Sequence, residues 1–178
     1  MIRRIRAERR PKAIAWSDRF VLFVTTRATA QGRAGLGLRR DAPAFPGEGR
    51  GFTRLTDEGL VIEIFDLPDA KLFEEDSATP TPIAAEIGAI IGRLFRSVSN
   101  PVAIKGHLRA KSVLQLDNPV WELSTGRAAQ MRLMLEQGGL PPARIARLTG
   151  AADRVPAVRD ATAPRNNRIE VILLRSDG

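Results

Sequence analysis

The chain has 178 residues, which is long enough for one domain with a sizeable core and a tail. It contains no cysteine, so a disulfide framework and a thiolate metal site are both excluded. The net charge of +8 lies entirely in residues 1–50, and the remainder is neutral with sixteen basic and sixteen acidic residues, so we expect no nucleic-acid partner.

Residues 1–50 are rich in Arg, Gly, Ala and Pro and show little hydrophobic periodicity after Val24. This composition predicts a basic, disordered N-terminal segment, with at most one short strand or helix at 18–26. The alternative is contact with an anionic lipid surface or a wall polymer. The apolar run at residues 20–24 is too short to span a bilayer and too short for a signal peptide, so neither element is visible.

The next elements are a hairpin and a helix. Residues 52–56 and 60–65 are strand-like and flank Asp57-Glu58-Gly59, which predicts a turn with Gly59 at positive φ. Residues 66–73 form a loop with an apolar plug at Leu72-Phe73. Residues 79–82 are typical of a helix start, and the apolar residues that follow recur at helical spacing and predict a buried face. That face comprises Ile83, Ile87, Ile90, Ile91, Leu94, Phe95 and Val98.

The second half predicts strands at 102–107, 144–148 and 168–174, with Ile169, Val171 and Leu173 on one face of the last. Between the first two lies a helix for which Ser124 is the expected N-cap and Gly138-Gly139 the end. Its apolar positions are Ala128, Met131, Leu133, Met134 and Leu135. The order β-β-α-β-α-β-β predicts a two-layer α/β sandwich, with a mixed β-sheet and two main helices on one face.

Arg127 falls in the first turn of a helix that starts at Ser124, where the helix dipole disfavours a cation. It is either a surface arginine paired with a nearby carboxylate or, with the free N–H groups of that turn, an anion site. Catalysis is not expected, because His107 is the only histidine and Ser124 is explained as a cap. We therefore expect no enzyme activity, no metal and no cofactor, and we interpret His107 as a strand-end residue that holds the following loop by hydrogen bonds.

Several pieces of the chain occur in the order and spacing of a known family. They are Gly106-His107, the run Asn118-Pro-Val-Trp-Glu-Leu-Ser-Thr-Gly-Arg-Ala128, Gly138-Gly139-Leu140, residues 144–150, Ala152-Asp153 and Asn166-Asn167-Arg168-Ile169-Glu170. With the preceding strand and helix they resemble the OmpA-like peptidoglycan-binding domain over residues 52–175. Trp121 before Glu-Leu-Ser is similar to the flagellar stator (MotB) branch of that family. The resemblance implies an N-terminal segment at 1–50 and an OmpA-like domain at 51–178.

In that family an arginine binds the carboxylate of diaminopimelate in the stem peptide, and an aspartate binds its ammonium. The resemblance places the arginine at Arg127. Two residues of the Asn-Arg-Arg motif fall on Asn166 and Arg168, with Asn167 at the first arginine. Arg109 stands where the family has the aspartate, which reverses the local charge. We therefore expect a plain dianion to be preferred over a zwitterion.

The resemblance implies a ligand site made of Arg127, Asn118, Asn166, Arg168, Ser124 and His107. It also implies a non-covalent cell-wall anchor of a stator B subunit, with peptidoglycan, a second copy of the chain and a stator A-type membrane subunit as partners. Such a domain would be periplasmic and belong to an inner-membrane protein. The alternative is a divergent OmpA-like module that has lost muropeptide binding and serves as a dimerisation or structural domain.

Overall fold

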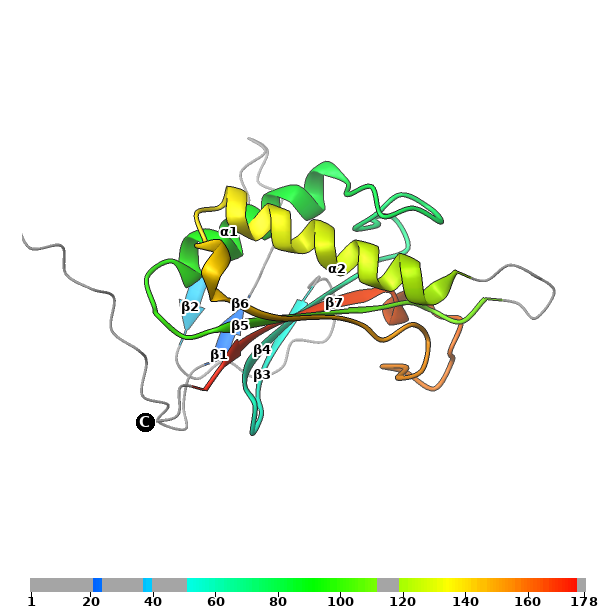
Figure 1. Ribbon diagram of the computed structural model, residues 1–178. Coiled ribbons are helices and arrows are strands. Elements are labelled where there is room, and N and C mark those ends of the chain that lie inside the picture. The colour runs from blue at the N-terminus through cyan, green and yellow to red at the C-terminus, as the bar shows by residue number, and fades with distance from the viewer. Residues whose placement is uncertain (1–20, 24–36, 40–50, 112–118, 176–178) are drawn as a thin grey trace, which may run out of the picture.

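The computed structural model describes residues 21–23, 37–39, 51–111 and 119–175 (Figure 1). The expected disorder of residues 1–50 therefore falls mostly outside the described residues. Within that segment, β1 (Val21–Phe23) and β2 (Gly37–Arg39) pair as a short antiparallel ribbon. Strand β1 lies inside the range 18–26 where one short element is expected.

The main sheet has five strands in the order β3-β4-β7-β5-β6. They are β3 (Gly51–Leu55), β4 (Gly59–Phe65), β5 (Val102–His107), β6 (Ile145–Gly150) and β7 (Arg168–Leu174). Strands β5 and β6 are parallel and the other neighbours are antiparallel, so the predicted mixed sheet is confirmed. The predicted hairpin is also confirmed: Gly59 begins β4 with φ +147, and a Cβ there would lie 2.1 Å from the carbonyl oxygen of Leu173.

Both main helices, α1 (Pro82–Phe95) and α2 (Val120–Gln137), lie on one face of the sheet (Figure 1). Helix α1 is capped by Thr81, whose Oγ1 accepts from the backbone N–H of Ala84 at 3.4 Å. Two short 3-10 helices, η1 (Pro142–Arg144) and η2 (Pro164–Asn166), precede β6 and β7. The predicted two-layer α/β sandwich is therefore confirmed.

The core lies between the helices and the sheet. In β7 the alternate residues Ile169, Val171 and Leu173 face the helices, as the period-two pattern predicts. The apolar plug is confirmed as well, because Leu72 and Phe73 are only 1% and 2% exposed. The predicted core position Leu133 is wrong: it is 46% exposed, because the core side of α2 is formed by Ala128, Met131, Met134 and Leu135.

Helix α2 begins one turn earlier than the sequence predicts. Its N-cap is Pro119, and its first bond runs from the N–H of Leu123 to the Pro119 carbonyl oxygen at 2.8 Å. Val120 and Leu123 pack in a small cluster with Leu108 and Ala152, so tertiary contacts favour helix before Ser124. The N-cap assignment of Ser124 is therefore wrong, and Arg127 lies well inside the helix rather than in its first turn.

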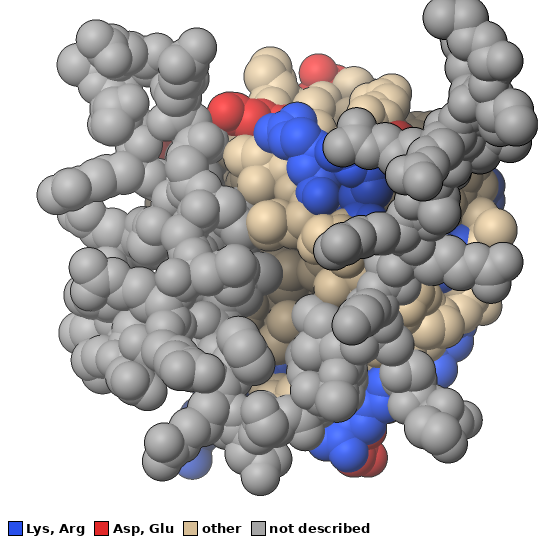
Figure 2. All heavy atoms as spheres, turned by 90° about the vertical axis from the view of Figure 1, so that its left-hand side faces the viewer, with Lys and Arg blue, Asp and Glu red and all other residues tan. Residues whose placement is uncertain are grey.

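Both helices finish at the same end of the molecule, which Figure 2 views directly. Basic side chains gather there beside few acidic ones, and Arg93 lies in the last turn of α1. A cation near a helix C-terminus is favoured by the helix dipole.

Among the residues that the structure describes, no helix combines the length and hydropathy that crossing a membrane requires.

Candidate functional site

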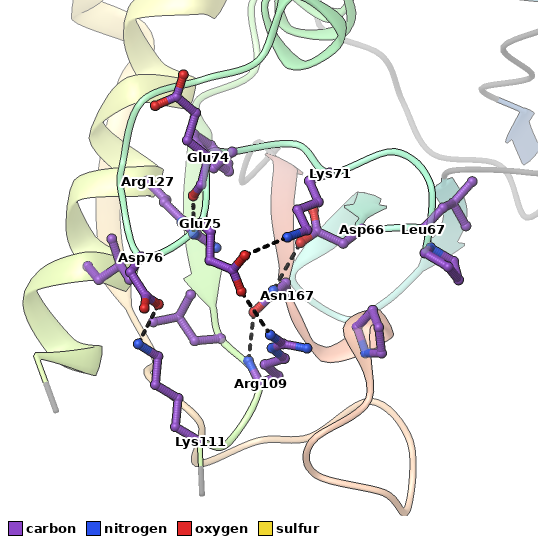
Figure 3. A pocket seen from close by; sticks show the side chains of 15 residues that line it. Asp66, Leu67, Lys71, Glu74, Glu75, Asp76, Arg109, Lys111, Arg127 and Asn167 are labelled. Carbon is purple, nitrogen blue, oxygen red and sulfur yellow. Dashed lines mark hydrogen bonds and ion pairs between the residues drawn. The ribbon is translucent and has the colours of Figure 1, made fainter. Parts of the chain in front are cut away.

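A pocket of about 270 Å³, lined by both charged and apolar residues, lies at the opposite end, where α2 begins (Figure 3). Its walls come from the loop before α1, from the residues after β5, from α2, and from the start of η2 and the residue that follows it. Four acidic and four basic side chains line it, so it is close to neutral in formal charge. The lining residues are Asp66, Leu67, Pro68, Lys71, Phe73, Glu74, Glu75, Asp76, Leu108, Arg109, Lys111, Leu123, Arg127, Pro164 and Asn167.

Arg127 reaches this pocket from α2 and holds the loop before α1. Its Nε donates to the carbonyl oxygen of Ser77 at 2.9 Å, and its Nη2 donates to that of Glu74 at 3.1 Å. The residue is only 5% exposed, and burial lowers the pKa of the guanidinium from its ordinary value. A guanidinium has five N–H donors, so these two bonds leave further donors for a ligand. Arg127 is therefore a buried loop-holding residue that also lines the pocket.

Asp66 and Asn167 form a hydrogen-bonded pair in the pocket wall that no sequence motif indicates. The Nδ2 of Asn167 donates to Asp66 Oδ2 at 2.9 Å, and its Oδ1 accepts from the backbone N–H of Arg109 at 2.8 Å. The other oxygen of Asp66 accepts from the N–H of Leu72 at 2.7 Å. Burial raises the pKa of Asp66, against these hydrogen bonds and the nearby charges of Arg127 and Lys71. Asn167 therefore aligns the segment that carries Arg109.

Two acidic residues at the mouth of the pocket face basic residues across it (Figure 3). Glu75 lies 3.0 Å from the Nζ of Lys71 and 3.6 Å from the Nη2 of Arg109. Asp76 forms an ion pair with Lys111. Hydrogen bonds from Lys71 and Lys111 lower the pKa values of Glu75 and Asp76, respectively. Arg109 is thus in the pocket as expected, but its charge is balanced by Glu75.

The acidic run at 74–76 was the available sequence signal for these two residues. It directly follows the apolar plug at Leu72-Phe73, which predicts a surface loop anchored at one end. Nothing in the sequence indicated that this loop faces residues 109–111 across a pocket. That relation depends on how the loop folds back toward the end of β5.

Ser124 does not line the pocket, and its hydroxyl joins two backbone segments. Its Oγ donates to the carbonyl oxygen of Trp121 at 3.0 Å and accepts from the N–H of Ala152 at 3.1 Å. The residue is fully buried in the middle of the second turn of α2. The expected free N–H groups at 125–127 are engaged in the helix, so the predicted anion site at a helix terminus is absent here.

Asn166 also lies outside the main pocket and serves the loop before η2. Its Oδ1 accepts from the N–H groups of Ala157 and Val158 at 2.7 and 3.2 Å. Its Nδ2 donates to the carbonyl oxygen of Asp160 at 2.7 Å. All of these partners lie in one surface loop, and Asn166 is completely buried. Its expected place in the lining of the pocket is wrong.

Arg168 of β7 and His107 of β5 stand opposite each other in the strand register. Their side chains lie on the sheet face away from the helices, because Ile169 and Ile104, which have the opposite orientation in the same strands, face the core. The Nε of Arg168 lies 3.4 Å from Glu170 Oε1, and its Nη2 donates to the Val155 carbonyl oxygen at 3.0 Å. The two residues do line a narrow crevice beneath the pocket, together with Arg127 and other residues, but it is too small for a water molecule. Arg168 is thus committed to a buried ion-pair network rather than to the pocket.

His107 is 1% exposed, and its Nε2 lies 3.6 Å from Glu170 Oε1. Neither ring nitrogen has a hydrogen-bond partner, so the expected role in holding the following loop by hydrogen bonds is wrong. Burial lowers the pKa of His107 from its ordinary value. Asn118, the last of the expected site residues, lies outside the described residues. In the part of the chain that the structure describes, no three His, Asp or Glu side chains group as a metal site.

Comparison with known proteins identifies relatives of flagellar type. No protein-family model matches the chain. Over 123 residues it is 29% identical to the flagellar export/assembly protein LafU of Escherichia coli O44:H18, which covers 67% of this chain and 39% of that protein. Over 130 residues it is 32% identical to Motility protein B of Escherichia coli K12, which covers 67% of this chain and 40% of that protein. The chain therefore spans less than half the length of either relative.

Solved structures share the fold. The periplasmic domain of Helicobacter pylori MotB superposes with a TM-score of 0.58 at 18% identity, covering 74% of this chain and 85% of that one. The cell wall anchor of the T6SS from Pseudomonas aeruginosa gives a TM-score of 0.56 at 24% identity, covering 71% and 89%. At these identities the likeness concerns the fold alone, and it agrees with the strand order and helix placement described above.

Proposed function

We propose that this MotB-like OmpA-like domain anchors the protein that carries it to the peptidoglycan wall without a covalent bond. The observation that supports this most directly is the pocket, which Arg127 of α2 lines. The chain that forms this pocket shares its fold with a solved cell wall anchor. The neighbouring structures are of anchoring and periplasmic domains, and the two curated relatives are flagellar proteins. Binding rather than catalysis is the proposed activity.

The charges of the pocket fit a stem-peptide side chain that carries a carboxylate and an ammonium. Arg127 and Arg109 supply guanidinium donors for the carboxylate. Glu75 and Asp66 supply carboxylates for the ammonium, in place of the family aspartate. Each charge-assisted contact contributes on the order of 1.5–3 kcal/mol when it is shielded from water. Two such contacts sum to about 3–6 kcal/mol, which the entropic cost of binding reduces further, so we expect weak, roughly millimolar binding of the isolated side chain.

The setting of the domain follows from the same resemblance. We infer a periplasmic position in a protein held in the inner membrane, where the wall is within reach. The proposed partners are peptidoglycan, a second copy of the chain and a stator A-type membrane subunit. The likeness to Motility protein B supports the last two, and light scattering on the full chain at tens of micromolar tests self-association. A strictly monomeric chain at that concentration would contradict the dimer.

Sedimentation with purified sacculi tests the anchoring proposal. The wild-type chain should sediment with sacculi, free diaminopimelate should release it, and lysine should release it less well. Arg127→Ala should stay in the supernatant, while Arg132→Ala, an exposed arginine of the same helix paired with Glu136, should sediment as wild type does. If the wild type and Arg127→Ala remain equally in the supernatant, anchoring is refuted and a structural or dimerisation module becomes the better description.

A further inference from the structure

The mouth of the pocket is bordered by two segments of opposite charge. The acidic segment, residues 74–76, precedes α1, and the basic segment, residues 109–111, follows β5. Two ion pairs cross between them, Arg109 with Glu75 at 3.6 Å and Lys111 with Asp76 (Figure 3). Any ligand group that enters between Arg109 and Glu75 therefore meets a cation on one side and a carboxylate on the other.

These pairs are exposed enough to exchange partners readily. The side chains of Arg109 and Glu75 are 39% and 64% exposed, and an ion pair of that kind contributes only about 0–1 kcal/mol. The carboxylate of Glu75 is also held by Lys71, so it stays at the mouth when Arg109 turns to a ligand. Arg127 donates hydrogen bonds to the backbone carbonyl oxygens of Glu74 and Ser77, and these bonds restrict movement of the acidic segment.

The consequence is an electrostatic selection among ligands of the same size. A plain anion that binds Arg109 comes close to the carboxylates of Glu75 and Asp76 and is repelled by them. A ligand that presents an ammonium beside its carboxylate offers a new partner of opposite charge to both Arg109 and Glu75 at once. Its ammonium then faces Glu75 and its carboxylate faces Arg109, so no charge at the mouth loses its partner.

We propose that Glu75 and Arg109 are the specificity-determining pair of this pocket, with Glu75 receiving the cationic group and Arg109 the anionic group of a zwitterionic side chain. This inference rests on the proposed function and reverses the expectation from sequence that Arg109 favours a plain dianion. The expectation rested on the charge of Arg109 alone, whereas in the folded chain the carboxylate of Glu75 lies beside that charge. In this chain the carboxylate proposed to bind the ammonium is therefore Glu75 of the loop before α1, and not an aspartate after β5, where Arg109 stands.

The test compares two probes of the same length that differ by one ammonium, 2-aminopimelate and pimelate, titrated into the full chain and followed by NMR. The wild type should bind 2-aminopimelate about tenfold more tightly than pimelate, the factor expected for one charge-assisted contact. Glu75→Gln should abolish the preference, both by weakening 2-aminopimelate binding and by strengthening pimelate binding. Glu58→Gln breaks an exposed ion pair to Arg147 away from the pocket and should retain the wild-type preference.

A charge exchange keeps the test independent of local folding. Glu75→Arg and Arg109→Glu should each lose the preference, and the double variant should recover at least part of it, because the opposite charges again face each other. A Glu75→Gln variant that keeps the tenfold preference, or a wild type that prefers pimelate, overturns the inference while sacculus binding still upholds the proposed function. If neither probe shifts any signal and sacculi are not bound, both are overturned.

Discussion

The guanidinium of Arg127 lies over the ring of Phe73, with 5.1 Å between its central carbon and the ring centroid. Phe73 is part of the buried plug before α1, and Arg127 comes from α2, so the contact joins the two sides of the pocket. The same guanidinium donates to two carbonyl oxygens of the loop between them. One side chain therefore shapes the pocket and fixes its acidic wall.

Replacing Arg127 by lysine should be destabilising even though the charge is kept. A lysine ammonium cannot reproduce the planar fork that donates to both Ser77 and Glu74, nor the stacking on Phe73. We expect a loss of about 1.5–3 kcal/mol in the free energy of unfolding, measured by urea denaturation. Arg132→Lys, in the exposed Arg132–Glu136 pair of the same helix, should change it by less than about 0.5 kcal/mol. Equal effects at both positions would contradict the structural role of Arg127.

The close approach of α2 to β5 gives a second prediction. A Cβ on Gly106 would lie 2.1 Å from the carbonyl oxygen of Ser124, which is backbone and cannot rotate away. Gly106→Ala should therefore force the helix off the sheet and lower the free energy of unfolding by about 1–3 kcal/mol. Gly126→Ala is the matched change within α2: its Cβ would lie 3.2 Å from that of Ala78, and the gain in helix propensity of about 1 kcal/mol offsets this contact. A Gly106→Ala variant as stable as Gly126→Ala would refute this packing.

The ion-pair network behind the sheet gives a pH prediction. Burial lowers the pKa of His107, so the native state keeps the neutral ring while the unfolded chain takes up a proton below about pH 6.5. Stability should therefore fall as the pH drops from 6.5 toward the folded-state pKa. Measured unfolding free energies should decline over this window in the wild type, and His107→Gln should flatten the decline. An unchanged slope in that variant would show that His107 titrates normally.

A second loss should follow at lower pH from Glu170. Burial alone would raise the pKa of this carboxylate, but His107, once it is protonated at low pH, together with Arg168 and Arg54 outweighs burial and lowers the value to about 2. Because Glu170 is lowered from 4.5, its stabilisation, on the order of 3 kcal/mol, is present above pH 4.5 and is lost as the pH falls through about 2. The free energy of unfolding, measured between pH 5 and 2, should fall less steeply with decreasing pH in Glu170→Gln than in the wild type. A wild type whose stability stays constant over that range would contradict the assignment.

The fold was predictable because its signals are local. Period-two alternation in β7, the Thr-Pro start of α1 and the Asp-Glu-Gly turn each depend on neighbouring residues, and all three are confirmed. The candidate site was less predictable, because its geometry depends on register and loop packing. The alternation in β7 does place Arg168 on the face away from the helices, but no local pattern shows that the preceding Asn167 lines the pocket and binds Asp66. The start of α2 was misplaced because packing of Val120 and Leu123 prevailed over the capping preference of serine.

The last prediction separates the observed role of Ser124 from the expected cap. Ser124 and Thr125 both donate to the carbonyl oxygen of Trp121, at 3.0 and 2.8 Å, but only Ser124 also accepts, from the N–H of Ala152. Ser124→Ala should leave that buried N–H without a partner and lower the free energy of unfolding by about 1–3 kcal/mol. Thr125→Ala removes an exposed hydroxyl from the same carbonyl and should cost less than about 0.5 kcal/mol.

Amide hydrogen exchange identifies where the loss occurs. In Ser124→Ala the exchange of the Ala152 amide should accelerate, because its acceptor is gone, while the amides of the first turn of α2 should exchange as in the wild type. A helix cap at Ser124 would give the reverse pattern, with faster exchange confined to the N–H groups at 126 and 127. Faster exchange there, with Ala152 unchanged, would mean that α2 begins at Ser124 after all and that the segment after β6 is held by other contacts.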